Sequence, residues 1–176
     1  MYPYNRKTQL YHTPIRAKER TNTTQSSDLS TDRRLQELLM LAKQEAAQLA
    51  QKYTALLQEE ALTEAQNIIK TMETDGKKHQ RILQEVLFII FSDTAEEMTE
   101  EMPETETETN SGAALLEELL LTELDDIPFY RSLLSAMEDN DLWDLMFEIL
   151  TDKQNHTAAL NHLYAKYFTR ISGNNN

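Results

Sequence analysis

Four stretches of the chain carry apolar residues at steps of three and four, and this spacing constrains the fold more than any other feature. Such steps return to the same face of an α-helix, whereas a half-buried strand needs strict alternation. Each stretch therefore predicts one amphipathic helix whose apolar seam faces a shared core. The seams are Leu35, Leu39, Ala42, Ala46, Leu49, Tyr53 and Leu56; Ile69, Met72, Gly76, His79, Leu83, Val86 and Ile90; Leu116, Leu120, Glu123, Ile127, Tyr130, Leu134 and Met137; and Leu142, Met146, Ile149, Lys153, His156, Leu160, Leu163 and Tyr167.

The scarcity of turn-forming residues agrees with a helical fold. The chain has 176 residues but only 3 glycines and 4 prolines, too few for the many turns of an all-β fold. It has no cysteine, which excludes a disulfide scaffold and any cysteine-ligated metal site. We therefore expect an all-α protein, built as an antiparallel four-helix bundle. Thr63-x-x-Gln66 predicts a capping box before the second helix, and Asn140 predicts the N-cap of the fourth.

Three segments lie outside the seams and divide the chain. In residues 1–20, five basic residues against one acidic residue give a charge of +4, and we expect residues 1–30 to form a flexible basic arm. Residues 93–112 contain eight acidic residues and no basic one, which predicts a solvated acidic crossover, longer than an ordinary loop. Residues 172–176 form a polar tail. The bundle itself is expected over residues 31–171.

Charge and hydropathy argue against two classes of partner. The formal net charge of −13 argues against binding to nucleic acid. The longest apolar run, from Val86 to Phe91, is far shorter than the roughly 18 residues that a membrane-spanning helix needs. The polar N-terminal sequence lacks the apolar core of a signal peptide, so we expect a cytoplasmic protein.

The two halves of the chain repeat at an interval of 77 positions. In this register an Asp-x-x-x-His sequence recurs, once in the second predicted helix and once in the fourth. The repeat predicts that the bundle is a duplicated helical hairpin. The corresponding pairs are Ala46 and Glu123, Tyr53 and Tyr130, Asp75 and Asp152, Gly76 and Lys153, and His79 and His156.

Four polar side chains occupy seam positions, where an unpaired charge is costly. They are His79, Glu123, Lys153 and His156. Taken singly, a seam histidine is typical of a core residue with one hydrogen bond. Because the four fall at matching heights in the 77-residue register, we expect them to meet in one layer of the bundle.

A family resemblance is carried by three segments: METDGKKHQRIL at 72–83, LTELDDIPFYRSL at 121–133 and FEILTDKQNHTAAL at 147–160. The chain resembles the ferritin-like di-iron carboxylate superfamily, and within it the rubrerythrin-like domains of small bacterial proteins. That family uses one Glu from each of two helices and Glu-x-x-His from each of the other two. The resemblance covers roughly residues 33–170 and implies a ferritin-like bundle.

Three of the six metal ligands that the resemblance implies are present, namely His79, Glu123 and His156. Both bridging carboxylates are absent, and a lysine adds a cation where metals would be bound. The three positions that lack a ligand hold Ala46, Gly76 and Lys153. The resemblance further implies that Asp75 and Asp152 orient the histidines, and we expect Tyr53 and Tyr130 to hydrogen-bond to the layer.

These departures lead us to expect a degenerate ferritin-like bundle that has no competent di-iron centre, needs no cofactor and is not an enzyme. It would act as a structural or protein-interaction protein, with a protein partner or a second copy of itself. In one alternative, Glu123 and His156 retain a single divalent metal (Fe, Mn or Zn), with metal-binding or oxidoreductase activity. In another, residues 93–112 form an acidic adaptor for a basic partner. The resemblance also leaves a spore-associated role open.

The lysine on the fourth seam leads to a specific expectation. Lys153 lies between Ile149 and His156, so its ammonium should be at least partly buried. We expect Lys153 to pair with Glu123, so that the ammonium replaces the missing metal cation, with Asp75, Asp152 and the two histidines completing the hydrogen bonds. The alternative is that Lys153 extends along its aliphatic stem to solvent.

Overall fold

The computed structural model describes residues 25–91 and 112–168, with side chains from Asp32 onward. These ranges contain four α-helices, α2 (Gln25–Leu56), α3 (Gln66–Phe91), α4 (Gly112–Ser135) and α5 (Asn140–Tyr167), together with one short 3-10 helix, η1 (Glu60–Ala65). They contain no strand, which confirms the all-α prediction. The acidic crossover, the polar tail and most of the basic arm lie outside the described residues.

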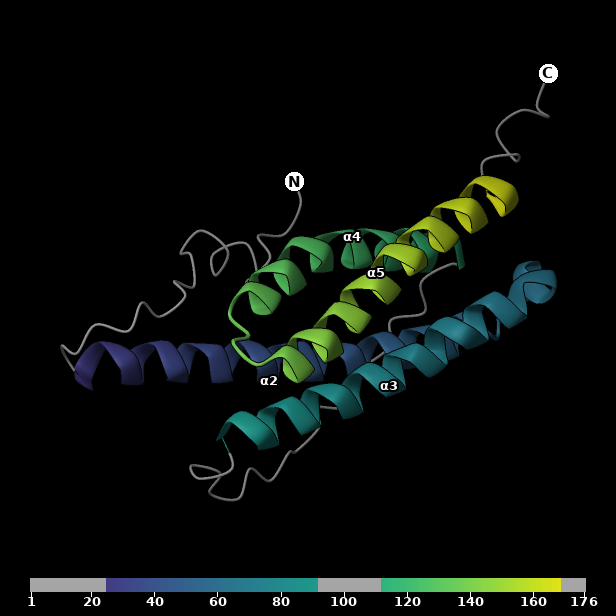
Figure 1. The fold of residues 1–176 in the computed structure, drawn as a ribbon. Helices are drawn as coiled ribbons and strands as arrows, with labels where there is room; N and C mark the ends of the chain where they lie inside the picture. The colour runs from purple at the N-terminus through teal and green to yellow at the C-terminus, as the bar shows by residue number, and fades with distance from the viewer. Residues whose placement is uncertain (1–24, 92–111, 169–176) are drawn as a thin grey trace.

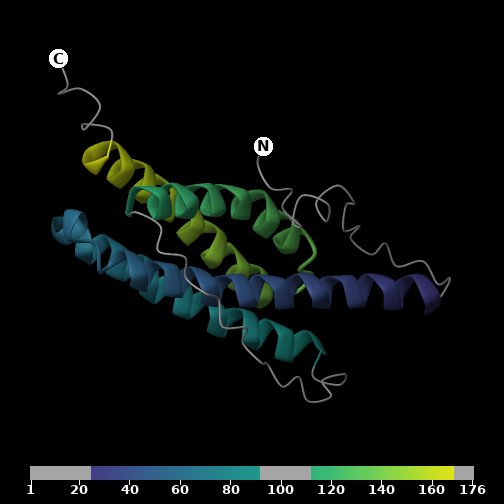
Figure 2. The ribbon, with the colours of Figure 1, turned by 180° about the vertical axis from the view of Figure 1, so that it is seen from behind.

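The helices form two pairs that pack on each other. α2 packs most extensively on α3, to which η1 connects it, and α4 packs most extensively on α5 (Figure 1). The view from behind shows the same two pairs, with α4 and α5 lying across one side of α2 and α3 (Figure 2). Within the described ranges, no helix is both long and apolar enough to cross a membrane.

The apolar core is divided into two clusters at opposite ends of the bundle. The first cluster joins the early part of α2 and α5 to the late part of α3 and α4, and includes Leu39, Leu83, Val86, Leu133 and Met146. The second joins the late part of α2 and α5 to the early part of α3 and α4, and includes Leu56, Ile69, Leu116, Leu119 and Leu160. α3 therefore ends at the opposite end of the bundle from the start of α4, and residues 92–111 join these two ends.

Three of the four predicted seams face the core as expected, and the third does so in part: Leu116, Glu123, Tyr130 and Met137 are buried. In α4 the predicted positions Leu120, Ile127 and Leu134 are only partly buried, and their neighbours take the core positions. Leu119, Leu120 and Leu121 are consecutive leucines, so the apolar pattern does not determine which of them faces inward. Leu119, Asp126, Phe129 and Leu133 thus join Leu116, Glu123 and Tyr130 as the core positions of α4.

The helix starts differ from those predicted. α2 begins at Gln25, within the range assigned to the arm, and α4 begins at Gly112, the last residue assigned to the crossover. Thr63 does not form a capping box, because its hydroxyl donates to the carbonyl of Glu60 inside η1. The N-cap of α5 is Asp139 rather than Asn140: the Asp139 carboxylate accepts hydrogen bonds from two backbone N–H groups of the first turn, at 2.8 and 3.1 Å.

This difference at α5 gives a test. Replacing Asp139 by Ala should lower the free energy of unfolding by about 0.5–2 kcal/mol, because two N–H groups of the first turn lose their acceptor. The matched change, Asn140→Ala, should stay within about 0.5 kcal/mol of the parent. Urea unfolding followed by circular dichroism measures both. An equal loss in the two variants would contradict the assignment of Asp139 as the cap.

Candidate functional site

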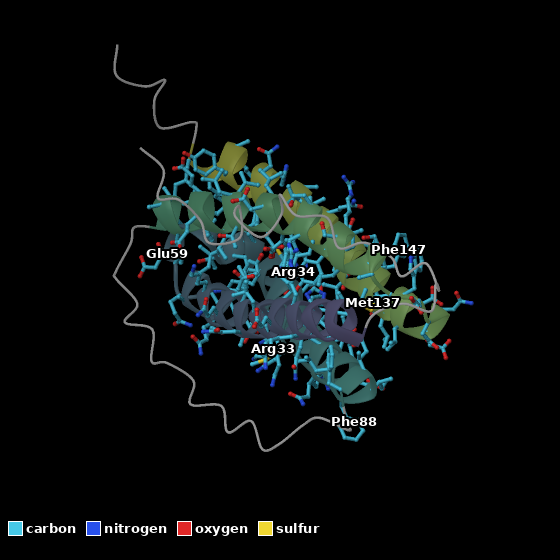
Figure 3. The ribbon with its side chains drawn as sticks, turned by 90° about the vertical axis from the view of Figure 1, so that its left-hand side faces the viewer. Arg33, Arg34, Glu59, Phe88, Met137 and Phe147 are labelled. Atoms are coloured by element: carbon cyan, nitrogen blue, oxygen red, sulfur yellow. The ribbon has the colours of Figure 1, made fainter. Side chains whose placement is uncertain are left out.

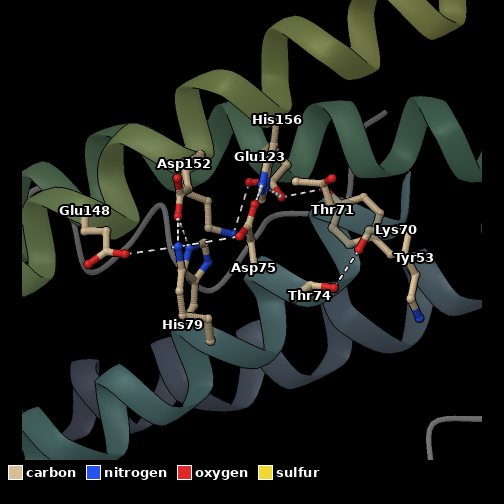
Figure 4. Close-up of polar contacts among 12 residues, drawn as sticks. Tyr53, Lys70, Thr71, Thr74, Asp75, His79, Glu123, Glu148, Asp152 and His156 are labelled. Atoms are coloured by element: carbon tan, nitrogen blue, oxygen red, sulfur yellow. Dashed lines mark hydrogen bonds and ion pairs between the residues drawn. The ribbon is translucent and has the colours of Figure 1, made fainter. Parts of the chain in front are cut away.

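Between the two apolar clusters lies a layer of buried polar side chains to which all four helices contribute (Figure 4). We call it the polar layer. Most of its members are shielded from solvent, although buried polar groups are costly unless they are paired. Its residues are Tyr53 from α2, Asp75, Lys78 and His79 from α3, Glu123, Asp126 and Tyr130 from α4, and Asp152, Lys153 and His156 from α5.

The centre of the polar layer is the ammonium group of Lys153. Its Nζ atom lies 2.8 Å from Oδ2 of Asp126 and 3.1 Å from Oε2 of Glu123. The three side chains have relative exposures of 2%, 1% and 0%. The predicted pairing of Lys153 with Glu123 is therefore confirmed, and the alternative in which Lys153 reaches solvent is wrong.

The charges of this cluster stabilise one another. Burial would lower the pKa of Lys153, but the carboxylates of Asp126 and Glu123 raise it above its usual 10.5. Burial would likewise raise the pKa of Glu123, but Lys153 and the hydrogen bond from His156 lower it to about 2. Lys153 and Glu123 are therefore both charged near neutral pH.

Glu123 is the residue that connects the ammonium to the rest of the layer. Its Oε1 atom accepts a 2.6 Å hydrogen bond from the Tyr53 hydroxyl and lies 3.2 Å from Nδ1 of His156. Its Oε2 atom is buried without a hydrogen bond, so the Lys153 ammonium compensates it through charge. The predicted hydrogen bond of Tyr53 is thus present. Tyr130 instead presents its ring, whose centroid is 5.8 Å from Nζ of Lys153.

The two histidines exchange partners across the interface between α3 and α5. His79 of α3 lies 3.0 Å from the carboxylate of Asp152 on α5, and His156 of α5 lies 3.1 Å from that of Asp75 on α3. The ring centroids are 6.0 Å apart. The +77 register maps each of these pairs onto the other, so the contacts follow the internal repeat.

A second ammonium lies at the edge of the polar layer. Nζ of Lys78 is 2.7 Å from Asp152, 3.1 Å from Glu148 and 3.5 Å from Asp75. Burial would lower its pKa, but the hydrogen bonds to Asp152 and Glu148 raise it above the usual value. The carboxylates that orient the histidines are therefore themselves held by a cation. The side chains of Asp75 and Asp152 are partly open to solvent, each with a relative exposure of 20%.

The residues present do not fit the di-metal centre that the family resemblance implies. Lys153 places an ammonium among the carboxylates, and Ala46 is buried with no ligand atom. A Cβ atom on Gly76 would lie only 3.2 Å from that of Ala50, so α2 and α3 approach closely where a bridging carboxylate would be needed. Among the described residues, no group of three or more His, Asp or Glu side chains is arranged to hold a metal ion.

A nearby buried carboxylate does not replace the missing ligands. Glu73 lies one turn before Gly76, but its oxygens accept hydrogen bonds from Lys70 and Lys77 at 2.6 Å and from Thr54 at 3.1 Å. The hydrogen bonds from Lys70 and Lys77 are the largest influence on its pKa, which they lower to about 2. Its partners are thus outside the polar layer.

The structure brings together all the residues singled out in the sequence and adds two that were missed. His79, Glu123, His156, Lys153, Asp75, Asp152, Tyr53 and Tyr130 all lie in or against the polar layer. Asp126 was missed because the predicted seam of α4 took Ile127 at this height, although Asp126 lies three residues after Glu123 and so shares its side of the helix. Lys78 was missed because it is not a seam residue.

Comparisons with known proteins find no relative of this chain. A scan against protein-family models gives no match, and searches of curated proteins and of solved structures give none either.

The central ion pairs can be tested by a double-mutant cycle. Lys153→Met strands two buried carboxylates and should lower the free energy of unfolding by about 3–5 kcal/mol. Glu123→Leu should cost less, because Asp126 still pairs with the ammonium. The double variant should cost clearly less than the sum of the single changes, as urea unfolding will show. Lys166→Met, at an exposed position, is the control and should change little. Additive effects would mean that Lys153 and Glu123 do not interact.

The polar layer also predicts how stability depends on pH. Burial lowers the pKa of His79 below its usual 6.5, so on acidification the unfolded chain takes up a proton before the folded chain does. The free energy of unfolding should therefore fall as the pH drops below about 6.5. The contribution of Glu123, present above its usual pKa of 4.5, should be lost as the pH falls through about 2. That of Lys153, present below 10.5, should be lost only in stronger alkali.

Urea titrations from about pH 2 to pH 12 measure this profile, and His79→Gln supplies the comparison. The variant should show a smaller loss as the pH falls below about 6.5, because the histidine whose pKa the fold lowers is gone. His162→Gln, at an exposed position on α5, is the matched control and should keep the parental slope. A parental slope in His79→Gln would contradict the prediction.

Proposed function

We propose that this chain is a degenerate ferritin-like antiparallel bundle in which buried ion pairs replace a di-metal centre, and that it acts as a structural or protein-interaction protein. Two observations support the ferritin-like arrangement. Residues 92–111 join opposite ends of the bundle, as a long crossover between two hairpins would. The exchanged pairs of His79 with Asp152 and of His156 with Asp75 follow the internal repeat.

The observation that carries the proposal is the buried ammonium of Lys153 between Glu123 and Asp126. A metal pair at this height would need carboxylates where the chain has Lys153 and Gly76. The ammonium already supplies the positive charge that Glu123 and Asp126 require. The buried charges of the layer are thereby compensated by the side chains themselves, which favours a structural over a redox role.

The alternative of a single divalent metal at Glu123 and His156 is less well supported. Both ring nitrogens of His156 lie within hydrogen-bond distance of a carboxylate, Nδ1 of Glu123 and Nε2 of Asp75. A metal would have to displace one of these partners, and Lys153 lies 3.1 Å from Glu123 as a competing cation. The alternative of an acidic adaptor rests on residues 93–112, of which all but Gly112 lie outside the described residues.

Iron loading tests the proposal. Protein purified without chelator, loaded anaerobically with Fe(II) and then exposed to oxygen, should show no absorption from an oxo-bridged di-iron centre. Any iron bound should be the same in the parent and in Glu123→Gln, because it would be held at the surface. Two tightly bound irons per chain would overturn the proposal. One equivalent of iron, manganese or zinc that Glu123→Gln abolishes would establish the single-metal alternative instead.

A further inference from the structure

Four large apolar side chains are exposed on the pair formed by α4 and α5. Leu121 and Leu124 of α4 have relative exposures of 41% and 45%, and Trp143 and Phe147 of α5 have 39% and 46%. The rings of Trp143 and Phe147 stack, with centroids 4.9 Å apart and an interplanar angle of 14°. We call these four residues the α4–α5 stripe.

Contacts to the other helices place the two halves of the stripe on facing sides of α4 and α5. Glu118 pairs with Lys52 and so marks the side of α4 toward α2. At about 100° per residue, Leu124 lies on the other side, toward α5, and Leu121 lies next to it on the outer surface. On α5, Glu148 marks the side toward α3 through Lys78. Trp143 lies about 140° from Glu148, toward α4, and Phe147 lies one turn after it.

The internal repeat shows that the fold does not require an apolar stripe. In the 77-residue register, the positions of the first helix pair that correspond to the stripe are polar or small. The corresponding residues are Gln44 for Leu121, Ala47 for Leu124, Gln66 for Trp143 and Lys70 for Phe147. The first hairpin, α2 and α3, thus fills these positions without large apolar side chains. The exposed apolar group on α4 and α5 is therefore a specific feature of the second hairpin.

The stripe also lies on the more acidic of the two helix pairs. Residues 112–168 contain eleven acidic and three basic residues, a balance of −8, whereas residues 25–91 contain ten and eight, a balance of −2. Exposed acidic side chains near the stripe are Glu117 and Asp125 on α4 and Asp144 on α5, and one exposed basic residue, Arg131, lies two turns after Leu124 on the same side of α4. An apolar centre with an acidic border favours a ligand that is apolar on one face and basic around it.

We propose that the α4–α5 stripe binds a basic amphipathic helix supplied by a partner protein. This inference rests on the proposed interaction function and names its surface and the chemistry of its partner. Leucines of such a helix, spaced by three and four, would pack between Leu124 and Phe147, and its lysines or arginines would face the acidic border. A second copy of this chain is a poorer occupant, because each copy carries a net charge of −13 and would present another acidic surface.

The sole tryptophan of the chain, Trp143, lies in the stripe and reports on its occupation. The probe is a synthetic peptide of about 18 residues, five helical turns, made of Leu and Lys with the leucines on one face. Its addition to the full-length protein should shift the Trp143 emission to shorter wavelength in a saturable way, because the indole becomes buried. A peptide of the same composition in scrambled order has the same charge without the apolar face, and it should bind about tenfold more weakly or worse.

Variants on the two helix pairs locate the binding site. Leu121→Gln with Phe147→Lys installs the residues that the first hairpin carries at the corresponding positions, and it should weaken binding of the peptide by about tenfold or more. Phe88→Gln is the matched control, because Phe88 is 66% exposed on α3 and lies away from Phe147 (Figure 3). It should leave the dissociation constant within about twofold. Unchanged circular dichroism of both variants excludes loss of the fold as the cause.

Four results would overturn the inference. The first is equal binding of the scrambled peptide, and the second is parental affinity of the variant Leu121→Gln with Phe147→Lys for the peptide. The third is an equal loss of peptide affinity in Phe88→Gln. The fourth is a dimer in sedimentation velocity that dissociates in the variant Leu121→Gln with Phe147→Lys, because the occupant of the stripe would then be a second copy of the chain. Much tighter peptide binding after Arg16→Glu with Lys18→Glu would show instead that the chain's own basic arm covers the stripe. None of these results bears on iron loading, so the proposed loss of the metal centre stands or falls separately.

Discussion

The buried charge of Lys153 is the constraint on which the centre of the bundle depends. A buried ammonium is tolerated only if carboxylates meet it at close range, so α5 can pack on α4 only where Glu123 and Asp126 lie opposite Lys153. Glu123 in turn receives the Tyr53 hydroxyl from α2 and the His156 ring from α5. One charged side chain thereby fixes the relative position of three helices, and the apolar core is split into a cluster on either side of it.

The exchanged histidine pairs fix the position of α3 along the bundle, relative to α5. Apolar seams alone allow helices to slide or rotate with little loss, because one leucine replaces another, whereas a polar contact is lost completely by a small shift. His79 with Asp152 and His156 with Asp75 tie α3 to α5 at one height. Since the two pairs follow the internal repeat, a hairpin that was duplicated would acquire both contacts from a single Asp-x-x-x-His sequence.

The sequence was sufficient for the helical class and for most of the polar layer, because seam spacing and the 77-residue repeat both depend on helix geometry alone. It was insufficient where neighbouring residues have the same chemical character and could each take the same position. Three consecutive leucines at 119–121 left the rotation of α4 undetermined, and Asp126 was missed as a consequence. The choice of Asp139 over Asn140 as a cap was equally open, because both residue types accept hydrogen bonds from a first helical turn. The pairing of Lys153 with Glu123, by contrast, followed from the cost of burying the charge of Lys153.

The two positions where the family resemblance implies a bridging carboxylate, Gly76 and Lys153, differ in what occupies the space. At Gly76 the absence of a side chain lets α3 approach α2, and a Cβ atom there would already be 3.2 Å from that of Ala50. A longer side chain would overpack this contact at a cost of about 1–3 kcal/mol. At Lys153 a long side chain carries a cation to the carboxylates of α4. A carboxylate introduced at Gly76 would thus clash at the contact between α2 and α3, and one introduced at Lys153 would face Glu123 and Asp126 without the Lys153 ammonium.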